Sequence, residues 1–224
     1  YIKPLNMKRK EFIKLASTGA LGISSLGYIS CQSKKEIFFK LSLAQWSLNK
    51  AIRGGEMSPY LFAEKSKNLG FTGLEYVNQL YDDVMKSDDK SSSVKNFIKK
   101  SNQLASDNGL ENVLIMIDDE GDLADENEEI RLQAIDNHKL WIDAAAEMNC
   151  SSVRLNLYGS KDVETWKALS IESLSRLGEH AKGSGLNVIV ENHGRITSNI
   201  PELMNAINGV NMENVGTLPD FGNF

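Results

Sequence analysis

The sequence predicts an α/β fold in which a parallel sheet is covered by helices. Short apolar runs rich in β-branched residues recur from about residue 37 onward. Longer segments with apolar residues at helical spacing separate these runs. Strands that alternate with helices in this way are typical of a parallel sheet with crossover connections. An open doubly wound sheet is the alternative, which the lack of a glycine-rich phosphate loop after the first strand disfavours.

Local signals place the elements in order. Strands are predicted where an apolar run ends in polar residues, over residues 37–48, 73–77, 112–117, 152–157, 186–191 and 215–218. Ser58 and Pro59 form a good helix start, and Gly70 and Gly109 are typical helix ends. Helices are predicted over residues 58–70, 91–108, 125–149, 162–182 and 201–207. One long helix is expected to pack through Ile130, Ala134, His138, Trp141, Ala145 and Met148.

The chain length and the number of strand–helix repeats indicate which type of parallel α/β fold to expect. Six strand–helix steps follow one another, and the last lacks its helix. A closed eight-stranded barrel typically needs about 250 residues. Fewer than 190 remain here once the first 36 are set aside. We therefore expect residues 37–224 to form a partial TIM (β/α)8 barrel, present through about strand six.

Residues 1–36 are expected to lie outside the fold, as an export signal and linker. A basic head after Met7 precedes an apolar stretch over residues 15–29, and small residues then lead to Cys31. This order is typical of an export signal, and residues 9–14 resemble a twin-arginine signal with Lys10 as the second basic residue. We expect a periplasmic protein, or a membrane-anchored lipoprotein with its lipid on Cys31. An amphipathic N-terminal helix is the alternative.

The charge distribution argues against a nucleic-acid partner. Residues 1–40 hold eight Lys or Arg and two acids. The rest of the chain has 17 basic and 28 acidic residues, a net charge of −11. A body this acidic is poorly suited to bind a phosphate backbone.

Two carboxylates mark the candidate active site. Glu191 and Asp220 each follow an apolar run that predicts a buried parallel strand. The carboxyl ends of barrel strands are where such folds build active sites. Because the two strands are successive, the pair is expected to bind one divalent metal. Alternatively, Glu191 caps the next helix or pairs with Arg195, and Asp220 is a turn former between Pro219 and Gly222.

Four segments give the chain a family resemblance from about residue 40 onward. They are Asn68 to Glu75, Ser152 to Asn156, Val190 to Gly194 and Leu218 to Phe224. They resemble the segment from helix one to strand two, and the later strand tips, of the xylose isomerase-like barrels. These are the sugar phosphate isomerase/epimerase group that also includes endonuclease IV.

The resemblance implies a divalent metal held by Glu, Asp, His and Glu from strands five to eight. Glu191 and Asp220 match the first two ligands, and the other two would lie beyond Phe224. Many relatives have a histidine three residues after the Asp, where this chain has Asn223. Without the last two ligands, we expect this chain alone to be inactive.

The implied reaction is isomerisation or epimerisation of a sugar or sugar phosphate. Such reactions remove a proton from the carbon next to a carbonyl, with a metal as Lewis acid and a carboxylate as general base. Glu191 is predicted to be both metal ligand and base. Carboxylate ligands suit Mn²⁺ or Mg²⁺, and an added histidine also permits Zn²⁺ or Co²⁺.

Further side chains at the strand tips are predicted to contact the substrate. They are Trp46, Glu75, Arg154, Asn156, His193 and Asn223. Arg154 and Asn156 share one strand face by period two, as do Glu191 and His193. Arg154 either binds sugar hydroxyls or a phosphate, or pairs with Glu191. Trp46 is either a sugar-stacking wall or a core residue, and His193 either contacts the substrate or has a structural role.

Two other polar features are expected to be structural. Residues 118–129 contain eight acids without the spacing of an EF-hand. We expect them to form a solvated loop whose acids favour the N-terminus of the next helix. His138 falls on an apolar helix stripe and is expected to pack rather than to bind a ligand.

Two other functions stay open. A lyase or hydratase acting on oxidised sugars would use the same site, and an exported location favours it because phosphorylated sugars are scarce there. A non-catalytic sugar-binding lipoprotein would use the same scaffold without the later ligands. The acidic charge of the body disfavours abasic-site DNA repair.

Overall fold

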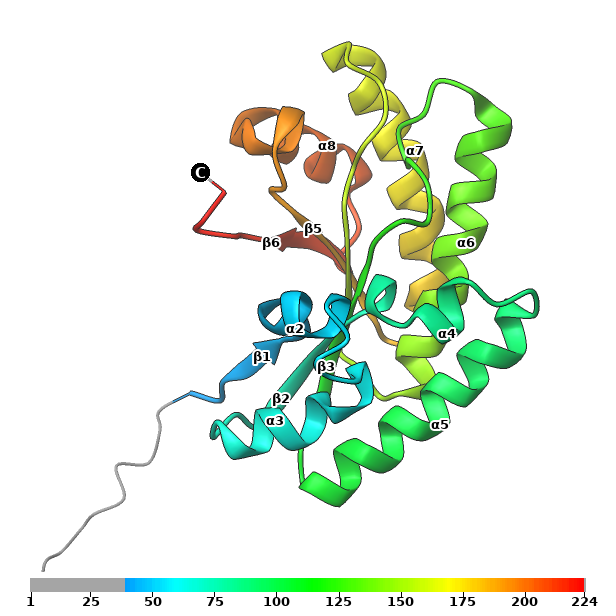
Figure 1. Cartoon of the computed structure of the whole chain (residues 1–224). Helices are drawn as coiled ribbons and strands as arrows, with labels where there is room; N and C mark the ends of the chain where they lie inside the picture. The colour runs from blue at the N-terminus through cyan, green and yellow to red at the C-terminus, as the bar shows by residue number, and fades with distance from the viewer. Residues whose placement is uncertain (1–38, 224) are drawn as a thin grey trace, which may run out of the picture. The chain divides into compact units, whose positions relative to one another are not determined.

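The computed structural model describes residues 39–223 of the chain. The predicted export signal and linker at residues 1–36, with Cys31, lie outside the described residues and stay predictions. From Lys40 onward the chain forms one unit. Its six strands hydrogen-bond side by side in chain order (Figure 1). Every neighbouring pair is parallel, which confirms the predicted α/β fold.

The strands lie close to where the sequence predicts them. They are β1 (Ser42–Ala44), β2 (Gly73–Val77), β3 (Glu111–Ile117), β4 (Ser152–Leu155), β5 (Asn187–Glu191) and β6 (Val215–Leu218). β1 is much shorter than predicted, because the chain turns into the 3₁₀ helix η1 (Gln45–Leu48), which contains Trp46. The buried side chain of Gln45 then accepts a hydrogen bond from the Val77 N–H at 3.0 Å. The side chain of Gln45 thus replaces the backbone hydrogen bond that β1 would otherwise make to β2 at this point.

Seven α-helices and three further 3₁₀ turns occur in residues 39–223. They are α2 (Asn49–Arg53), η2 (Pro59–Leu61), α3 (Phe62–Asn68), η3 (Asn78–Leu80), α4 (Asp82–Met85), α5 (Lys90–Asn108), α6 (Glu128–Glu147), α7 (Val163–Lys182), η4 (Arg195–Ser198) and α8 (Ile200–Val210). The long helices begin where a side chain accepts a hydrogen bond from their first turn. Asp89 caps α5, Asn127 caps α6 and Asp162 caps α7. None of the helices described is long and apolar enough to cross a membrane.

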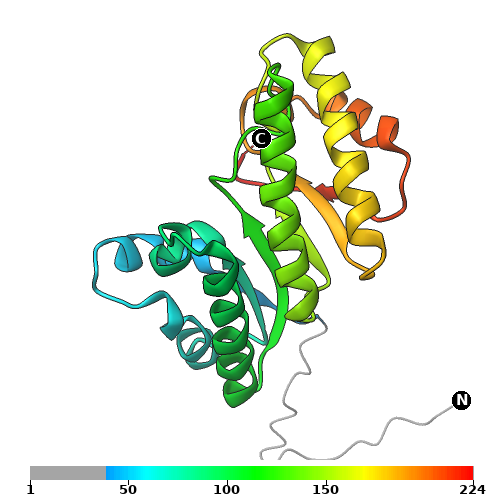
Figure 2. The same ribbon diagram turned by 90° about the vertical axis from the view of Figure 1, so that its right-hand side faces the viewer.

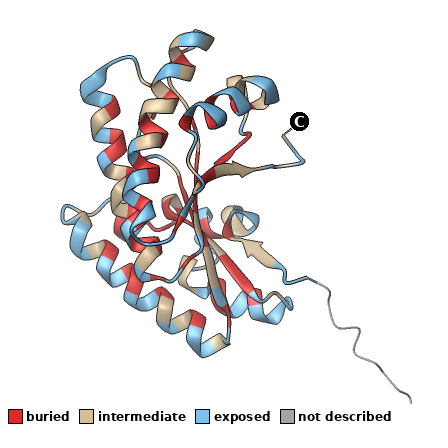
Figure 3. Cartoon of the chain, turned by 180° about the vertical axis from the view of Figure 1, so that it is seen from behind, coloured by how far each residue is buried: buried red, intermediate tan, exposed pale blue. Residues whose placement is uncertain are grey.

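The main core lies between the sheet and α5, α6 and α7, which cover one sheet face (Figure 2). Figure 3 shows buried residues along the strands and on the helix sides that face them. Trp141 and Trp166 are among its largest fully buried side chains. The prediction that Ile130 packs inward is wrong, since it is 51% exposed. Ile130 lies in the first turn of α6, beside the loop at residues 119–121 rather than the sheet.

The opposite face of the sheet carries a second, smaller apolar cluster. Its members alternate along their strands with residues that face the helices. They include Val77, Leu114, Met116, Ile189 and Leu218. In a closed barrel this inner face of the sheet lines the interior. Residues on the same face just beyond the carboxyl ends of the strands therefore point into the mouth of the barrel.

The loops that follow β3 and β4 touch at Gly159. The Ala124 N–H donates to the Tyr158 carbonyl, and the Ser160 N–H donates to the Ala124 carbonyl, both at 2.8 Å. Gly159 has a φ of +143°, and a Cβ there would lie 2.1 Å from the carbonyl carbon and oxygen of Ala124. Glycine alone fits so close an approach.

Gly159→Ala is expected to lower the free energy of unfolding by about 2–3 kcal/mol, because the two loops must move apart. Gly183→Ala is the matched control. Gly183 has helical backbone angles and open space around its Cα, so its substitution should change stability by less than about 1 kcal/mol. Urea denaturation followed by circular dichroism measures both variants. Wild-type stability in Gly159→Ala would contradict the close approach.

Candidate active site at the barrel mouth

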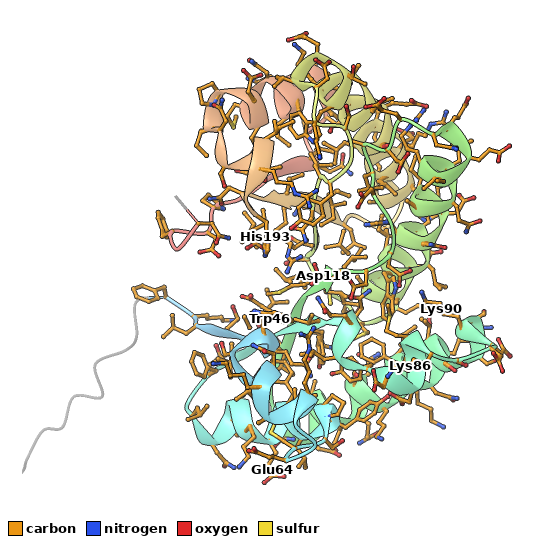
Figure 4. The ribbon with its side chains drawn as sticks, turned by 45° about the horizontal axis from the view of Figure 1, so that its top comes forward. Trp46, Glu64, Lys86, Lys90, Asp118 and His193 are labelled. Atoms are coloured by element: carbon orange, nitrogen blue, oxygen red, sulfur yellow. The ribbon has the colours of Figure 1, made fainter. Side chains whose placement is uncertain are left out.

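At the carboxyl ends of the strands, the residues on the inner face of the sheet change from apolar to polar. Continuing the period of two past the apolar cluster gives Asp118, Arg154, Asn156, Glu191, His193 and Asp220. These side chains border one cavity of about 700 Å³. All eight residues predicted for the site line it: Trp46, Glu75, Arg154, Asn156, Glu191, His193, Asp220 and Asn223. Trp46, Asp118 and His193 are labelled around this opening in Figure 4.

The carboxylates of Glu191 and Asp220 converge on one amide. Asn223 Nδ2 donates to Glu191 Oε1 at 3.2 Å and to Asp220 Oδ2 at 2.9 Å. A single nitrogen within reach of both oxygens places the two acids next to each other. The geometry therefore has the convergence that a shared metal site would need.

Asn192 fixes the backbone of Asp220 beside β5. Its Oδ1 accepts from the Asp220 N–H at 2.6 Å, and its Nδ2 donates to the Asp220 carbonyl at 3.0 Å. Asn192 is 2% exposed, so these bonds are shielded from water. Nothing in the sequence marks Asn192 as a site residue, because an asparagine after a strand is an ordinary turn residue.

Asp220 also forms the turn that the alternative interpretation proposed. Its Oδ1 accepts from the Gly222 N–H at 2.7 Å, while Oδ2 faces Asn223. One carboxylate thus closes the turn and lines the cavity. Arg195 does not pair with Glu191; its guanidinium lies 5.1 Å from the ring centroid of Tyr158.

Arg154 lies between two acids. Its Nη1 is 2.7 Å from Asp118 Oδ1, and its Nε is 2.9 Å from Glu191 Oε2. The Nε–H does not point at a hydrogen-bond acceptor, so the contact with Glu191 is an ion pair without hydrogen-bond geometry. Asn156 Nδ2 also donates to Asp118 Oδ1, at 2.8 Å. Of the two interpretations of Arg154, the structure favours the ion pair.

The prediction of a solvated loop over residues 118–129 is wrong for Asp118 and Glu120. Asp118 carries the contacts with Arg154 and Asn156. Period two from Met116 would have placed Asp118 on the inner face, but its position inside an acidic run hid that signal.

Glu120 is 3% exposed and anchors this loop to two helices. Lys90 Nζ lies 2.6 and 2.7 Å from its two oxygens, and Trp141 Nε1 donates to it at 2.5 Å. Asn78, on η3, donates from Nδ2 to Glu120 Oε1 at 3.3 Å. The Oδ1 of Asn78 accepts a hydrogen bond from the Asp118 N–H at 2.8 Å. A buried carboxylate held in this way fixes the loop that carries Asp118.

Trp46 lines the cavity from η1, just after β1, and Glu75 lines it from β2. Trp46 is 42% exposed, and the guanidinium of Arg53 lies 4.8 Å from its ring centroid. An aromatic ring braced in this way can stack against a sugar. Glu75 accepts a short hydrogen bond from the Ser42 hydroxyl.

His193 pairs with Tyr158, a residue that the sequence analysis did not single out. The Tyr158 hydroxyl lies 2.7 Å from His193 Nδ1, and both residues line the cavity. Tyr158 continues the period of two from Arg154 and Asn156, but it lies three residues past the end of β4, beyond the strand tip to which the prediction was confined. The pair leaves His193 Nε2 as the ring atom able to contact a bound molecule.

The described residues fit part of a divalent-metal site. Glu191 and Asp220 present carboxylate oxygens to the cavity, and such oxygens suit hard cations. No set of three or more His, Cys, Asp or Glu suited to a metal occurs among residues 39–223. These two carboxylates would therefore be a partial set of ligands.

Burial raises the pKa of the Glu191 carboxyl above its ordinary value. The Arg154 guanidinium opposes this shift, as does His193, and the neighbouring Asp220 adds to it. Glu191 thus holds its proton more readily in the folded protein than in the unfolded chain. The stability gained from that proton is lost as the pH rises from the ordinary pKa through the raised one.

Carbon-13 NMR titration is expected to place the pKa of Glu191 above the ordinary value of about 4.3. Arg154→Met should raise it further, because the favourable charge is lost. Arg176→Met is the matched control, since Arg176 pairs with Glu172 on α7 and is half exposed. A Glu191 pKa at or below the ordinary value, or one that falls in Arg154→Met, would contradict this picture.

Comparisons with known proteins agree with the fold. D-psicose 3-epimerase in the presence of D-fructose is 17% identical, with a TM-score of 0.60 over 81% of this chain and 63% of that one. The IolI protein with a bound zinc atom is 16% identical, with a TM-score of 0.62 over 80% and 62%. The probable 3-DHS dehydratase AsbF of Bacillus anthracis is 15% identical, with a TM-score of 0.59 over 82% and 63%.

The match thus spans less than two thirds of these solved chains. No curated protein matches this chain in sequence. The family described as the xylose isomerase-like TIM barrel matches residues 63–224, well over half of the chain. The chain belongs to the xylose isomerase-like TIM barrel family.

Proposed function

We propose that this chain is part of a metal-dependent sugar or sugar phosphate isomerase or epimerase. The reaction would remove a proton from the carbon next to a carbonyl. The convergence of Glu191 and Asp220 on one cavity, where Asn223 donates to both, carries this proposal. The presence of sugar epimerases among solved proteins of the same fold supports it.

Glu191 is the proposed general base as well as a metal ligand. It is 7% exposed yet lines the cavity, so a carbon-bound proton can be brought to it away from bulk water. Its raised pKa strengthens it as a base, because a base works best with a pKa near the operating pH. The contact with Arg154 keeps a positive charge beside the carboxylate.

Asp220 is the proposed second ligand of a Mn²⁺, Mg²⁺, Co²⁺ or Zn²⁺ ion. When bound, such an ion supplies Lewis-acid polarisation of a carbonyl oxygen. A zinc atom in one solved relative of the same fold supports a metal in this mouth. The match covers 62–63% of the solved chains, and we propose that the remaining ligands belong to the part left uncovered.

The substrate would lie between the two sides of the cavity. Trp46 offers a ring face for the sugar, and His193 Nε2 is free to bond a hydroxyl. Glu75 and Asn156 line the same space with polar atoms. A small sugar is therefore the proposed ligand. Two solved epimerases of this fold, one in the presence of D-fructose and one with D-tagatose, support that class of ligand.

A lyase or dehydratase reaction is the second candidate. The likeness to the probable 3-DHS dehydratase favours it, because a dehydratase can start from the same proton abstraction. We also propose export by residues 1–36, which rests on their sequence pattern alone. An exported enzyme would meet oxidised sugars more often than sugar phosphates.

Glu191→Gln is expected to lower the rate of proton exchange at the carbon next to the carbonyl by about 10²–10⁴-fold. The assay uses the full-length gene product with Mn²⁺ and ketoses in deuterated water, and proton NMR follows deuterium incorporation. Glutamine keeps the shape of the side chain and removes the base. Product analysis separates an epimer from a dehydrated product.

Glu64→Gln is the matched control for this assay. Glu64 is exposed on α3, and Figure 4 places it well away from Asp118 and His193. It should exchange at the wild-type rate. A wild-type protein that binds Mn²⁺ but exchanges no proton with any ketose would reject the proposed function.

A further inference from the structure

His138 reaches the cavity from the helix layer. It lies on α6 and is 2% exposed, yet it is among the residues that line the cavity. Its Nδ1 is 2.7 Å from the carbonyl oxygen of Ala134. Because a carbonyl oxygen can only accept, Nδ1 carries the hydrogen. This bond fixes the tautomer of the ring.

The other ring nitrogen of His138 is then an acceptor. Burial lowers the pKa of the imidazole to about 4, so the ring is neutral at physiological pH. Nε2 makes no hydrogen bond to any described residue. It is also not fully sealed from solvent, unlike a few other unpaired buried atoms of the described residues. Because His138 lines the cavity, Nε2 is its remaining acceptor for a molecule bound there.

None of the neighbouring charged groups donates a hydrogen bond to this nitrogen. Asp118 and Glu120 are acceptors when ionised, and the hydrogen bonds of Lys90 go to the two oxygens of Glu120 rather than to His138. A donor on a molecule bound in the cavity would give this nitrogen the hydrogen bond that the chain does not supply. A fully ionised phosphate ester offers only acceptor oxygens, whereas a sugar hydroxyl can donate.

We propose that His138 is a ligand-binding residue that accepts a hydrogen bond from a sugar hydroxyl through Nε2. The inference rests on the proposed function for the class of ligand. It follows that an uncharged, hydroxyl-bearing part of the substrate binds on the side of the cavity formed by α6. His138 both packs in the helix layer and binds, so the expectation that it only packs is incomplete.

The first test uses no sugar. Long-range proton–nitrogen NMR of the full-length protein is expected to show His138 with a protonated Nδ1 and a bare Nε2 between pH 6 and 8. His180, exposed on α7 beside Asp143, provides the comparison signal. A hydrogen on His138 Nε2 in that range would overturn the inference whatever the protein catalyses.

The second test measures binding of D-fructose and its 1-, 3-, 4- and 6-deoxy derivatives by calorimetry. His138→Phe keeps the ring size and removes the acceptor, and should weaken D-fructose binding about 3–10-fold. One deoxy derivative, lacking the bonded hydroxyl, should bind wild type and His138→Phe equally. His138→Gln, which retains an acceptor, should recover part of the loss, and His180→Gln should bind as wild type does.

The outcomes separate this inference from the proposed function. Equal affinities of His138→Phe and wild type for D-fructose overturn the inference, while proton exchange that depends on Glu191 would still stand. Binding that depends on His138 without any proton exchange supports the inference and rejects the reaction. If no ketose binds the wild type, both fail. If His138→Phe does not fold, the His138→Gln affinities and the tautomer decide.

Discussion

The site depends on holding two carboxylates next to each other in a mostly buried place. Glu191 and Asp220 repel each other when both are ionised, and burial adds to the cost. Asn223 offers its amide hydrogens to both, and Arg154 brings a positive charge to Glu191. Asn223 and Arg154 thus relieve part of the repulsion between the two carboxylates. A cation bound between Glu191 and Asp220 would relieve the same repulsion, so their arrangement is favourable for a cation.

The support around this pair comes from elements far apart in the sequence. Asn192 ties the backbone of Asp220 to the end of β5. Arg154 is itself fixed by Asp118, whose loop is held by Glu120 against α5 and α6. A substitution in this chain of contacts therefore acts on Glu191 without touching it, which is how a distant change can alter the chemistry of a site.

Much of the fold and the centre of the site could be predicted from local sequence. Apolar runs ending in acids gave the strands that carry Glu191 and Asp220, and all eight predicted site residues line one cavity. Asp118 was missed because it belongs to an acidic run, and its partner Arg154 is 36 positions away. The place of His138 at the cavity could not be predicted from its apolar helix stripe, because it depends on how α6 packs against the loop after β3. β1 was predicted too long because a side chain, Gln45, ends its ladder.

A crystal structure of the metal-free protein would show directly whether the two carboxyl groups share one pocket. We expect Glu191 and Asp220 both to lie within hydrogen-bond reach of Asn223 Nδ2 and to face the cavity that Arg154 also lines. Carboxyl groups that point to opposite faces of the sheet, or that lie too far apart to share one partner, would contradict it.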